Sequence, residues 1–345
     1  MNAAIVGGTG YGAVELIRLL KQHPSIQLNS VISKSQSGTL IQDAYPHLQD
    51  IYSHTMDEYD IHTLGEETDL VFFATPAGVS KDLVSGCLDK GITCVDLSGD
   101  FRLTGDGLYE TWYKKSPPEK SVQKKATYGL TEIYRKEIKE TSLISNPGCY
   151  PTATLLALMP LFKTNWAKEG GIVIDGKSGV SGAGRGMSLN THFSETNESL
   201  KAYKPGTHQH IPEIEQFLNT VSEEEVTVTF TPHLVPMTRG LLCTISVEMK
   251  EYQTTKDLIS YYEDFYKNDP FVRIRPEGKI PATKEVYGSN FCDIGFYSDK
   301  RTGRLTIVSA IDNLGKGAAG QAIQNVNVMN GWEETAGLGQ VPVYP

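Results

Sequence analysis

A cysteine in a tight turn is the residue of this chain best suited to covalent chemistry. Cys149 lies within 145–151, after Leu143 and Ile144, which predict the end of a buried strand, and before 152–159, which predicts a helix. A thiol at a helix start meets unpaired backbone N–H groups and the positive end of the helix dipole, which favour the thiolate. Cys149 is therefore a candidate nucleophile. The competing interpretation is a core cysteine, since free cysteines are commonly buried.

Two closely spaced histidines are the candidates for acid/base chemistry. His208 and His210 precede Pro212, which predicts the first turn of a helix that runs to about Val221. Histidine is the side chain whose ordinary pKa lies near neutral pH, so either ring can exchange a proton with a reacting group. The spacing alone does not decide which of the two would do so.

Two arginines that follow predicted strand ends, Arg102 and Arg185, are candidates for holding an anionic substrate. The formal net charge of −9 disfavours binding to nucleic acid or anionic membranes, so an anion must be held by locally placed cations or helix starts. A planar guanidinium matches a phosphate or carboxylate with two hydrogen bonds. A surface salt bridge with Asp100 or Asp106 explains Arg102 equally well.

The N-terminal stretch has the pattern of a dinucleotide site. An apolar strand at 2–6, a glycine-rich turn and a helix at 14–20 are followed by a second strand at 27–32. Glycines let the backbone approach a pyrophosphate at the helix start. Hydroxyls and a lysine replace the usual acidic residue after the second strand, which indicates a 2′-phosphate and hence NADP. The candidate contacts, including a further strand end, are Gly7, Thr9, Gly10, Tyr11, Gly12, Ser33, Lys34, Thr75 and Pro76.

Alternating strands and helices in the first half predict an α/β domain with a mostly parallel sheet. Residues 38–68 carry little pattern and are assigned only a connecting segment. The second half predicts an α+β domain with a helix at 255–266, and its alternating runs indicate half-buried antiparallel strands. One face of that sheet would be solvated or would form a homo-oligomer contact. The expected strands are 171–177, 226–231, 241–249, 271–274 and 304–309.

Composition excludes several classes of protein. The 345 residues have an ordinary globular composition and room for two domains. Five cysteines at scattered spacings, without a CxxC pair, indicate neither a disulfide framework nor a metal site. No apolar run has the roughly 18 residues of a membrane span, and no signal peptide is evident. We therefore expect a cytoplasmic protein.

Four motifs in this chain resemble those of one family, the N-acetyl-gamma-glutamyl-phosphate reductases, relatives of the aspartate-semialdehyde dehydrogenases. The similarity extends from residue 5 to residue 332 and includes the loops at 177–185 and 313–321. Gly99 stands where the family more often has alanine. The motifs are Gly7-x-Thr-Gly-Tyr-Gly12, Asp96-Leu-Ser-x-Asp-Phe-Arg-Leu103, Ser145-Asn-Pro-Gly-Cys-Tyr-Pro-Thr152 and His208-x-His-x-Pro-Glu-Ile214.

The resemblance implies a Rossmann-type NADP-binding domain, 1–148 plus 313–345, with an inserted α+β catalytic and oligomerisation domain, 149–312. It implies NADPH-dependent reduction of N-acetyl-L-glutamyl 5-phosphate to the 5-semialdehyde through a cysteine thioester, in arginine biosynthesis, by a homo-oligomer (dimer or tetramer). Further cofactor contacts are expected at Ser178, Gly179, Asn313 and Gly317. Substrate contacts are expected at Arg102, Arg185 and Asn146.

Three other functions remain open at this stage. A sibling reductase of aspartyl phosphate or N-acetyl-aminoadipyl phosphate would use the same residues. A cysteine hydrolase or acyltransferase would use Cys149 and a histidine without a redox cofactor, which leaves the glycine-rich turn unexplained. An NADP-sensing regulator would not need an activated thiol. The glycine-punctuated helix entry at 311–330 either packs tightly against another helix or borders a cofactor.

Overall fold

The computed structural model describes residues 1–164 and 166–345. These residues form two compact units: Met1–Pro147 with Ala318–Gly339, and Gly148–Gly317 with Gln340–Pro345. The sequence predicted the divisions after residues 148 and 312, whereas Gly148, 313–317 and 340–345 fall in the second unit here. No described helix is both long enough and apolar enough to cross a membrane.

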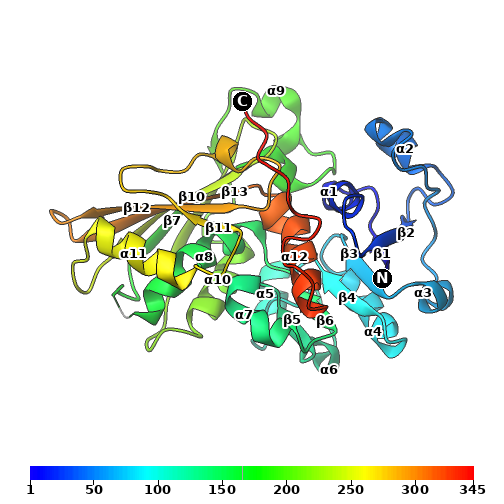
Figure 1. The fold of residues 1–345 in the computed structure, drawn as a ribbon, viewed down its shortest axis with the longest axis horizontal. Coiled ribbons are helices and arrows are strands. Elements are labelled where there is room, and N and C mark those ends of the chain that lie inside the picture. The colour runs from blue at the N-terminus through cyan, green and yellow to red at the C-terminus, as the bar shows by residue number, and fades with distance from the viewer. Residues whose placement is uncertain (165) are drawn as a thin grey trace. The chain divides into compact units, whose positions relative to one another are not determined.

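The first unit is a parallel α/β fold (Figure 1), as the sequence predicted. Its described strands form a six-stranded sheet of order β2-β1-β3-β4-β6-β5, in which all neighbours are parallel. The elements are β1 (Asn2–Val6), α1 (Tyr11–Leu20), β2 (Gln27–Ile32), α2 (Ile41–Ala44), η1 (Pro46–Leu48), α3 (Ile61–Glu67), β3 (Leu70–Phe73), α4 (Ser80–Asp89), β4 (Thr93–Asp96), α5 (Leu108–Tyr113), α6 (Lys120–Gln123), β5 (Ala126–Tyr128), α7 (Thr131–Ile138), β6 (Leu143–Ser145) and α12 (Gly320–Met329).

The strand register brings the candidate residues of this unit to one edge of the sheet. Val6 pairs with Ile32 on one side and Phe73 on the other, and Asp96 pairs with Phe73 and Ser145. The carboxyl ends of five strands are therefore level. Strand β1 lies between β2 and β3, so the chain order reverses there, which is where open α/β sheets bind ligands.

Residues 38–68 contain more structure than the connecting segment we expected. The short helices α2, η1 and α3 lie within this stretch. The Tyr45 hydroxyl donates a hydrogen bond to the Thr9 carbonyl at 2.9 Å, so part of the stretch braces the glycine-rich turn. Short helices of this kind carry too few apolar positions to produce a recognisable period.

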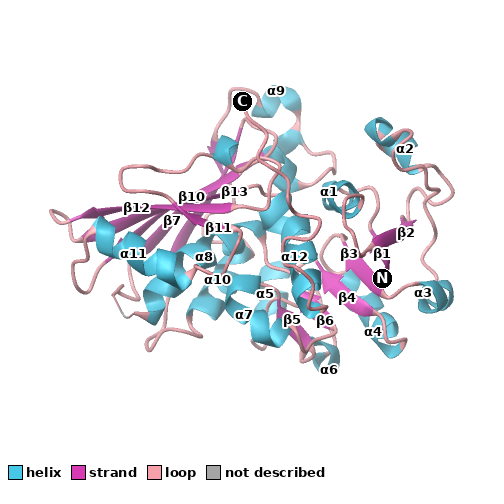
Figure 2. Ribbon diagram, in the orientation of Figure 1, coloured by secondary structure: helices cyan, strands magenta, loops and turns pink. Residues whose placement is uncertain are grey.

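The second unit is built on a mixed sheet. Its described strands form a seven-stranded sheet of order β11-β12-β13-β10-β7-β9-β8. Figure 2 shows β12, β13, β10 and β7 side by side. The elements are α8 (Cys149–Lys163), β7 (Ile172–Gly179), η2 (Val180–Ala183), η3 (Leu189–Thr191), α9 (Phe193–Thr196), β8 (Lys201–Ala202), α10 (His210–Leu218), β9 (Val228–Val235), β10 (Leu241–Glu248), α11 (Thr255–Phe265), β11 (Val272–Ile274), η4 (Thr283–Glu285), β12 (Cys292–Asp299), β13 (Arg304–Ile311) and a π-helical turn at Gly315–Ala319.

The expectation of antiparallel strands throughout this sheet was wrong for two of them. Strand β9 runs parallel to β7, and β11 runs parallel to β12. Alternating burial is present in β9 and β10 as predicted, but alternation reports that one face is covered and carries no information on strand direction. Strand β12 was missed because its first five residues are all buried, which removes the alternation.

Helix α8, which begins with Cys149, is anchored as a central element of this unit. All its residues from Tyr150 to Phe162 are buried. Pro160 lies inside the helix and has no N–H to donate to the Leu156 carbonyl. The Tyr266 hydroxyl donates to that carbonyl instead, at 2.6 Å. The residue that follows helix α11 thus supplies a hydrogen bond in place of the one that proline removes, and the helix that presents the cysteine keeps its place.

Candidate active site

Cys149 stands at the helix start that the sequence predicted. Helix α8 begins at Cys149, and the extended Gly148 precedes it without a side-chain cap on the first turn. Cys149 is partly exposed, whereas the other four cysteines of the chain are buried. The location favours a thiolate because uncapped N–H groups and the helix dipole stabilise negative charge.

Two glycines allow the backbone to pass close to this cysteine. A Cβ built on Gly317 would lie 2.9 Å from the Cys149 Cβ. A Cβ built on Gly148 would overlap the Nε2 atom of His210. Any larger residue at either position would displace the cysteine or the histidine. Gly317, which we expected to contact the cofactor, thus has a direct packing role beside Cys149.

The two histidines lie together in the same unit as Cys149. Their ring centroids are 4.6 Å apart and their planes are inclined by 66°. Helix α10 begins at His210 itself, so the expectation that both histidines precede the helix was wrong for His210. Pro212 falls in the first turn as predicted, and the helix ends at Leu218, before the expected Val221.

His208 is held in a neutral state by its surroundings. Tyr150, Tyr203 and Phe230 pack edge-on to its ring, with centroids 5.8, 5.5 and 5.5 Å away. Its Nδ1 accepts the backbone N–H of His210 at 3.1 Å, which places the ring proton on Nε2. Burial, with a smaller contribution from Lys204, lowers the pKa of His208 to about 3. This ring is therefore uncharged at neutral pH.

We expect the buried His208 to make the protein less stable in mild acid. Its pKa is about 3 in the folded state against 6.5 ordinarily. Between these values the unfolded chain binds more protons than the folded protein, so stability rises with pH. The contribution of His208 to the free energy of unfolding is fully present above about pH 6.5 and is lost progressively toward pH 3. Each pH unit in this window corresponds to about 1.4 kcal/mol, so going from pH 7.5 to pH 5 should cost about 2 kcal/mol from this group.

Urea unfolding at the two pH values measures this loss. The variant His208→Gln, which cannot be protonated, should show a smaller loss than the wild type. His23, whose pKa is also lowered chiefly by burial, changes stability in the same direction and is present in both proteins, so the comparison removes its contribution. An identical pH dependence in wild type and variant would contradict the assignment.

A buried glutamate ties the histidine helix to the cysteine turn. Glu213 is fully buried in the first turn of α10, and its Oε1 accepts the backbone N–H of Gly148 at 2.9 Å. Glu213 was not among the site residues predicted from the sequence. The signal was present, since Glu213 follows His210 by three positions and both therefore lie on one face of the helix.

Asn146 lies three residues before Cys149, and its backbone and side-chain polar groups all make hydrogen bonds within the first unit. Its N–H donates to the Asp96 carbonyl at 2.8 Å, and its carbonyl accepts from Arg102 Nε at 2.8 Å. Its side-chain Nδ2 donates to the Ala318 carbonyl at 3.1 Å, and its Oδ1 accepts from Asn325 Nδ2 at 3.1 Å. The end of β6 is thereby locked to helix α12.

Arg102 is a buried residue and not the surface arginine of the alternative interpretation. Its exposed fraction is 6%, and its Nη2 donates to the Leu97 carbonyl at 3.1 Å. Asp106 pairs with Lys120 at 2.8 Å. Arg185, by contrast, is exposed, on the segment that follows η2 in the second unit.

The second unit also holds the loop residues expected to contact the cofactor. Ser178 and Gly179 end strand β7, and the Gly179 N–H donates to the Gly240 carbonyl at 2.9 Å. Asn313 uses its amide inside the protein: Oδ1 accepts from the Gly240 N–H at 2.8 Å, and Nδ2 donates to Ser181 Oγ at 2.9 Å.

The residues of the first unit fit an NADP(H) molecule. Gly7 has φ +98°, and a Cβ there would lie 2.5 Å from the Ala74 carbonyl oxygen, so the turn requires glycine. Helix α1 starts at Tyr11, and its preceding residue Gly10 supplies no side-chain cap, which leaves N–H groups for a pyrophosphate. The Thr75 hydroxyl at the next strand end is covered yet has no hydrogen-bond partner among the described residues.

The expected 2′-phosphate contacts follow β2 in the same unit. Ser33 is buried and its Oγ accepts the N–H of Gln36 at 3.3 Å, while Lys34 is exposed. Pro76 lies after β3 as expected, whereas Gly12 lies in the first turn of α1, because this helix begins at Tyr11 and not at the predicted residue 14. A cation at the end of β2 suits a phosphate on the adenosine ribose.

Comparison with known proteins agrees with this arrangement. The family model for the semialdehyde dehydrogenase NAD binding domain matches residues 2–141, and that for the semialdehyde dehydrogenase dimerisation domain matches residues 149–313. The N-acetyl-gamma-glutamyl-phosphate reductase of Oceanobacillus iheyensis is 55% identical, with 100% of this chain and 99% of the relative covered. This chain belongs to the N-acetyl-gamma-glutamyl-phosphate reductase family. Another member, from a Geobacillus species, is 52% identical with both chains fully covered.

Solved structures share the fold at low identity. Aspartate semialdehyde dehydrogenase II from Vibrio cholerae has a TM-score of 0.72 at 15% identity, covering 95% of this chain and 98% of that one. Aspartate semialdehyde dehydrogenase with NADP from Candida albicans has a TM-score of 0.68 at 16% identity, with the same coverage. At such identities the similarity concerns the fold and not the substrate.

Proposed function

We propose that this protein catalyses the NADPH-dependent reduction of N-acetyl-L-glutamyl 5-phosphate to N-acetyl-L-glutamate 5-semialdehyde and phosphate, a step of arginine biosynthesis. The observation that carries the proposal is the constellation of Cys149 at the start of α8 with His208, His210 and Glu213 in the same unit. Full-length identity of 55% to a reductase of this name supports the choice of substrate.

Cys149 is the nucleophile of the first step. Its thiolate attacks the acyl carbon, a C–S bond forms, and the C–O bond to phosphate breaks as phosphate leaves with the electron pair. The product is a thioester on Cys149. Gly317 lets its backbone pack against the Cys149 Cβ, Gly148 lets the His210 ring lie close to the turn, and Glu213 fixes the turn by accepting the Gly148 N–H.

His210 is the acid/base group of the second step. NADPH, when bound, supplies the hydride that reduces the thioester carbonyl. His210 donates a proton to the developing oxyanion and recovers it when the C–S bond breaks to release the aldehyde. We choose His210 because its Nε2 lies against Gly148, next to the cysteine, whereas aromatic rings enclose His208 and keep it neutral.

Cofactor contacts are proposed separately for residues of each unit. Gly7, Thr9, Gly10, Tyr11 and Gly12 would hold the pyrophosphate, and Ser33 and Lys34 the 2′-phosphate. Thr75, Pro76, Ser178, Gly179 and Asn313 would line the remainder. These assignments, like the substrate contacts of Asn146, remain predictions.

We expect Arg102→Lys and Arg185→Lys to impair use of the acyl phosphate. Lysine keeps the charge but lacks the planar fork, so it cannot reproduce two hydrogen bonds to one anion. A lost charged hydrogen bond of about 1.5–3 kcal/mol predicts roughly a 10- to 100-fold lower kcat/KM, with NADPH affinity little changed. Arg301→Lys is a suitable control, since that side chain is 83% exposed and pairs with the nearby Asp299. Normal kinetics in both test variants would refute the role.

The reverse reaction tests the function directly. The protein should reduce NADP in a manner that depends on both N-acetyl-L-glutamate 5-semialdehyde and phosphate, and should do so poorly with NAD. Aspartate semialdehyde and the N-acetyl-aminoadipate analogue, offered side by side, separate the sibling reductases. A preference for either one would overturn the substrate assignment, and failure to bind NADPH would favour the hydrolase.

We further propose a homo-oligomer, a dimer or tetramer, that works in the cytoplasm. Strand β10 buries alternate residues, while the residues between them are partly exposed on the other sheet face. Val173 on the neighbouring β7 is 37% exposed. A partly apolar sheet face of this kind suits a contact with a second copy of the chain.

A further inference from the structure

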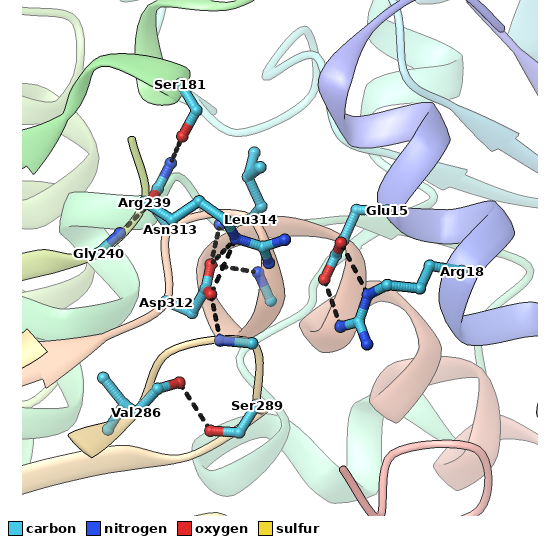
Figure 3. A network of polar contacts seen from close by, with 12 residues as sticks. Glu15, Arg18, Ser181, Arg239, Gly240, Val286, Ser289, Asp312, Asn313 and Leu314 are labelled. Carbon is cyan, nitrogen blue, oxygen red and sulfur yellow. Dashed lines mark hydrogen bonds and ion pairs between the residues drawn. The ribbon is translucent and has the colours of Figure 1, made fainter. Parts of the chain in front are cut away.

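A buried carboxylate at the end of β13 connects several loops of the second unit. Asp312 is fully buried, and its two oxygens lie 3.2 and 3.0 Å from the Nε of Arg239. The same carboxylate accepts backbone N–H groups from Gly288 at 2.6 Å, Leu314 at 2.9 Å and Gly315 at 3.1 Å. Figure 3 shows these bonds converging on Asp312.

One branch of this network leads to the segment expected to contact the cofactor. Arg239 lies in the loop 237–240, and that loop holds 179–181 through three backbone hydrogen bonds. The carbonyls of Met237, Thr238 and Gly240 accept from Val180, Ser181 and Gly179 at 2.9, 3.1 and 2.9 Å. Asn313, next to Asp312, ties the same two segments together through Gly240 and Ser181. The Asp312–Arg239 ion pair thus fixes loop 237–240, and this loop in turn holds segment 179–181.

The other branch leads to the cysteine. The Asp312 carbonyl accepts the N–H of Gly317 at 2.9 Å, and the Cβ position of Gly317 is 2.9 Å from the Cys149 Cβ. The intervening turn has little room to move, because a Cβ on Gly315 would overlap the Ser289 carbonyl. The Asp312 backbone, in a turn that the carboxylate holds through the N–H groups of Leu314 and Gly315, therefore sets where Gly317 lies beside the cysteine. Asparagine keeps this backbone bond.

We propose that Asp312, paired with Arg239, is a positioning residue that aligns segment 178–181, which holds the predicted cofactor contacts Ser178 and Gly179, with Cys149 for hydride transfer. The inference rests on the proposed function. A buried ion pair is a poor source of stability, because desolvation offsets most of its attraction, whereas its several directed hydrogen bonds specify geometry. Hydride transfer is sensitive to such geometry, since a displacement of about 1 Å can cost roughly 100-fold in rate.

The test compares two buried ion pairs of the same unit. Asp312→Asn removes the charge and one acceptor with little change of shape. Asp293→Asn removes the charge of a second fully buried aspartate. Asp293 lies in β12, and the Nε of Arg273 in β11 donates to it at 2.6 Å. Hydrogen exchange in the cofactor-free protein should show the amides of 179–181 exchanging at least about tenfold faster in Asp312→Asn and unchanged in Asp293→Asn.

Turnover provides the second readout. With 4-deuterated NADPH, Asp312→Asn should show a larger kinetic isotope effect and roughly a 10- to 100-fold lower kcat, while the cofactor-independent release of phosphate stays within about threefold of wild type. If Asp312→Asn fails to fold, Arg239→Lys is the second variant, since the Arg239 side chain is 15% exposed. It should show a smaller rise in the isotope effect and a smaller loss of kcat, again with phosphate release retained.

Unchanged exchange of 179–181 in folded variants, or equal loss of phosphate release and hydride transfer, would overturn the positioning role. A wild type that reduces no acyl phosphate would refute the proposed function, while the exchange comparison would still decide whether Asp312 positions the segment.

Discussion

Cys149→Ser should abolish turnover while leaving the cofactor site intact. A serine hydroxyl at the same helix start is a far weaker nucleophile than a thiolate and cannot form the thioester. We expect kcat to fall roughly 10⁴-fold or more, as for other covalent nucleophiles. The affinity for NADPH should stay within about threefold of the wild type, because the predicted cofactor contacts do not include the thiol. Steady-state kinetics and cofactor fluorescence titration measure the two quantities.

Thiol labelling supplies a control for this experiment. Because Cys149 is the only cysteine of the five that is not buried, native protein should react with iodoacetamide at one site, and Cys149→Ser should not react. Substantial turnover by a variant that is folded and unlabelled would exclude the covalent route.

The features that sequence alone predicted are those that depend on neighbours along the chain. An apolar strand, a Pro-Gly turn and an apolar helix place Cys149 at a helix start, and the structure confirms that helix α8 begins there. The glycine-rich turn between β1 and α1 was equally local, and the left-handed Gly7 is a backbone conformation that favours glycine. Short-range patterns of this kind reflect propensity and chain geometry directly.

The features that escaped prediction depend on residues distant in sequence. Nothing near Asp312 indicates that Arg239, 73 positions away, completes its hydrogen bonds. The bond from Gly148 to Glu213 spans 65 positions. The direction of β9 depends on its partner β7 and not on its own alternation. Such pairings are set by tertiary packing, which overrides local pattern.

The histidines lie between these two cases. Their spacing identified both as candidates, but the choice depends on what each ring touches. Tyr150, Tyr203 and Phe230 come from three separate parts of the chain to enclose His208. Desolvation by this enclosure lowers the pKa of His208, which the spacing of the two histidines does not reveal.

His210→Asn should therefore lower kcat by roughly 10²–10⁴-fold, the usual contribution of a positioned acid/base group. Asparagine can fill part of the space beside Gly148 but cannot donate and recover a proton. The matched variant His208→Gln should stay within about tenfold of wild type, because a neutral ring that accepts the His210 N–H contributes position and not protons. The single release of phosphate per active site that occurs without cofactor should persist in both variants, since the oxyanion that needs the proton forms only after hydride transfer. If His208→Gln were the inactive variant and His210→Asn the active one, the roles assigned to the two rings would have to be exchanged.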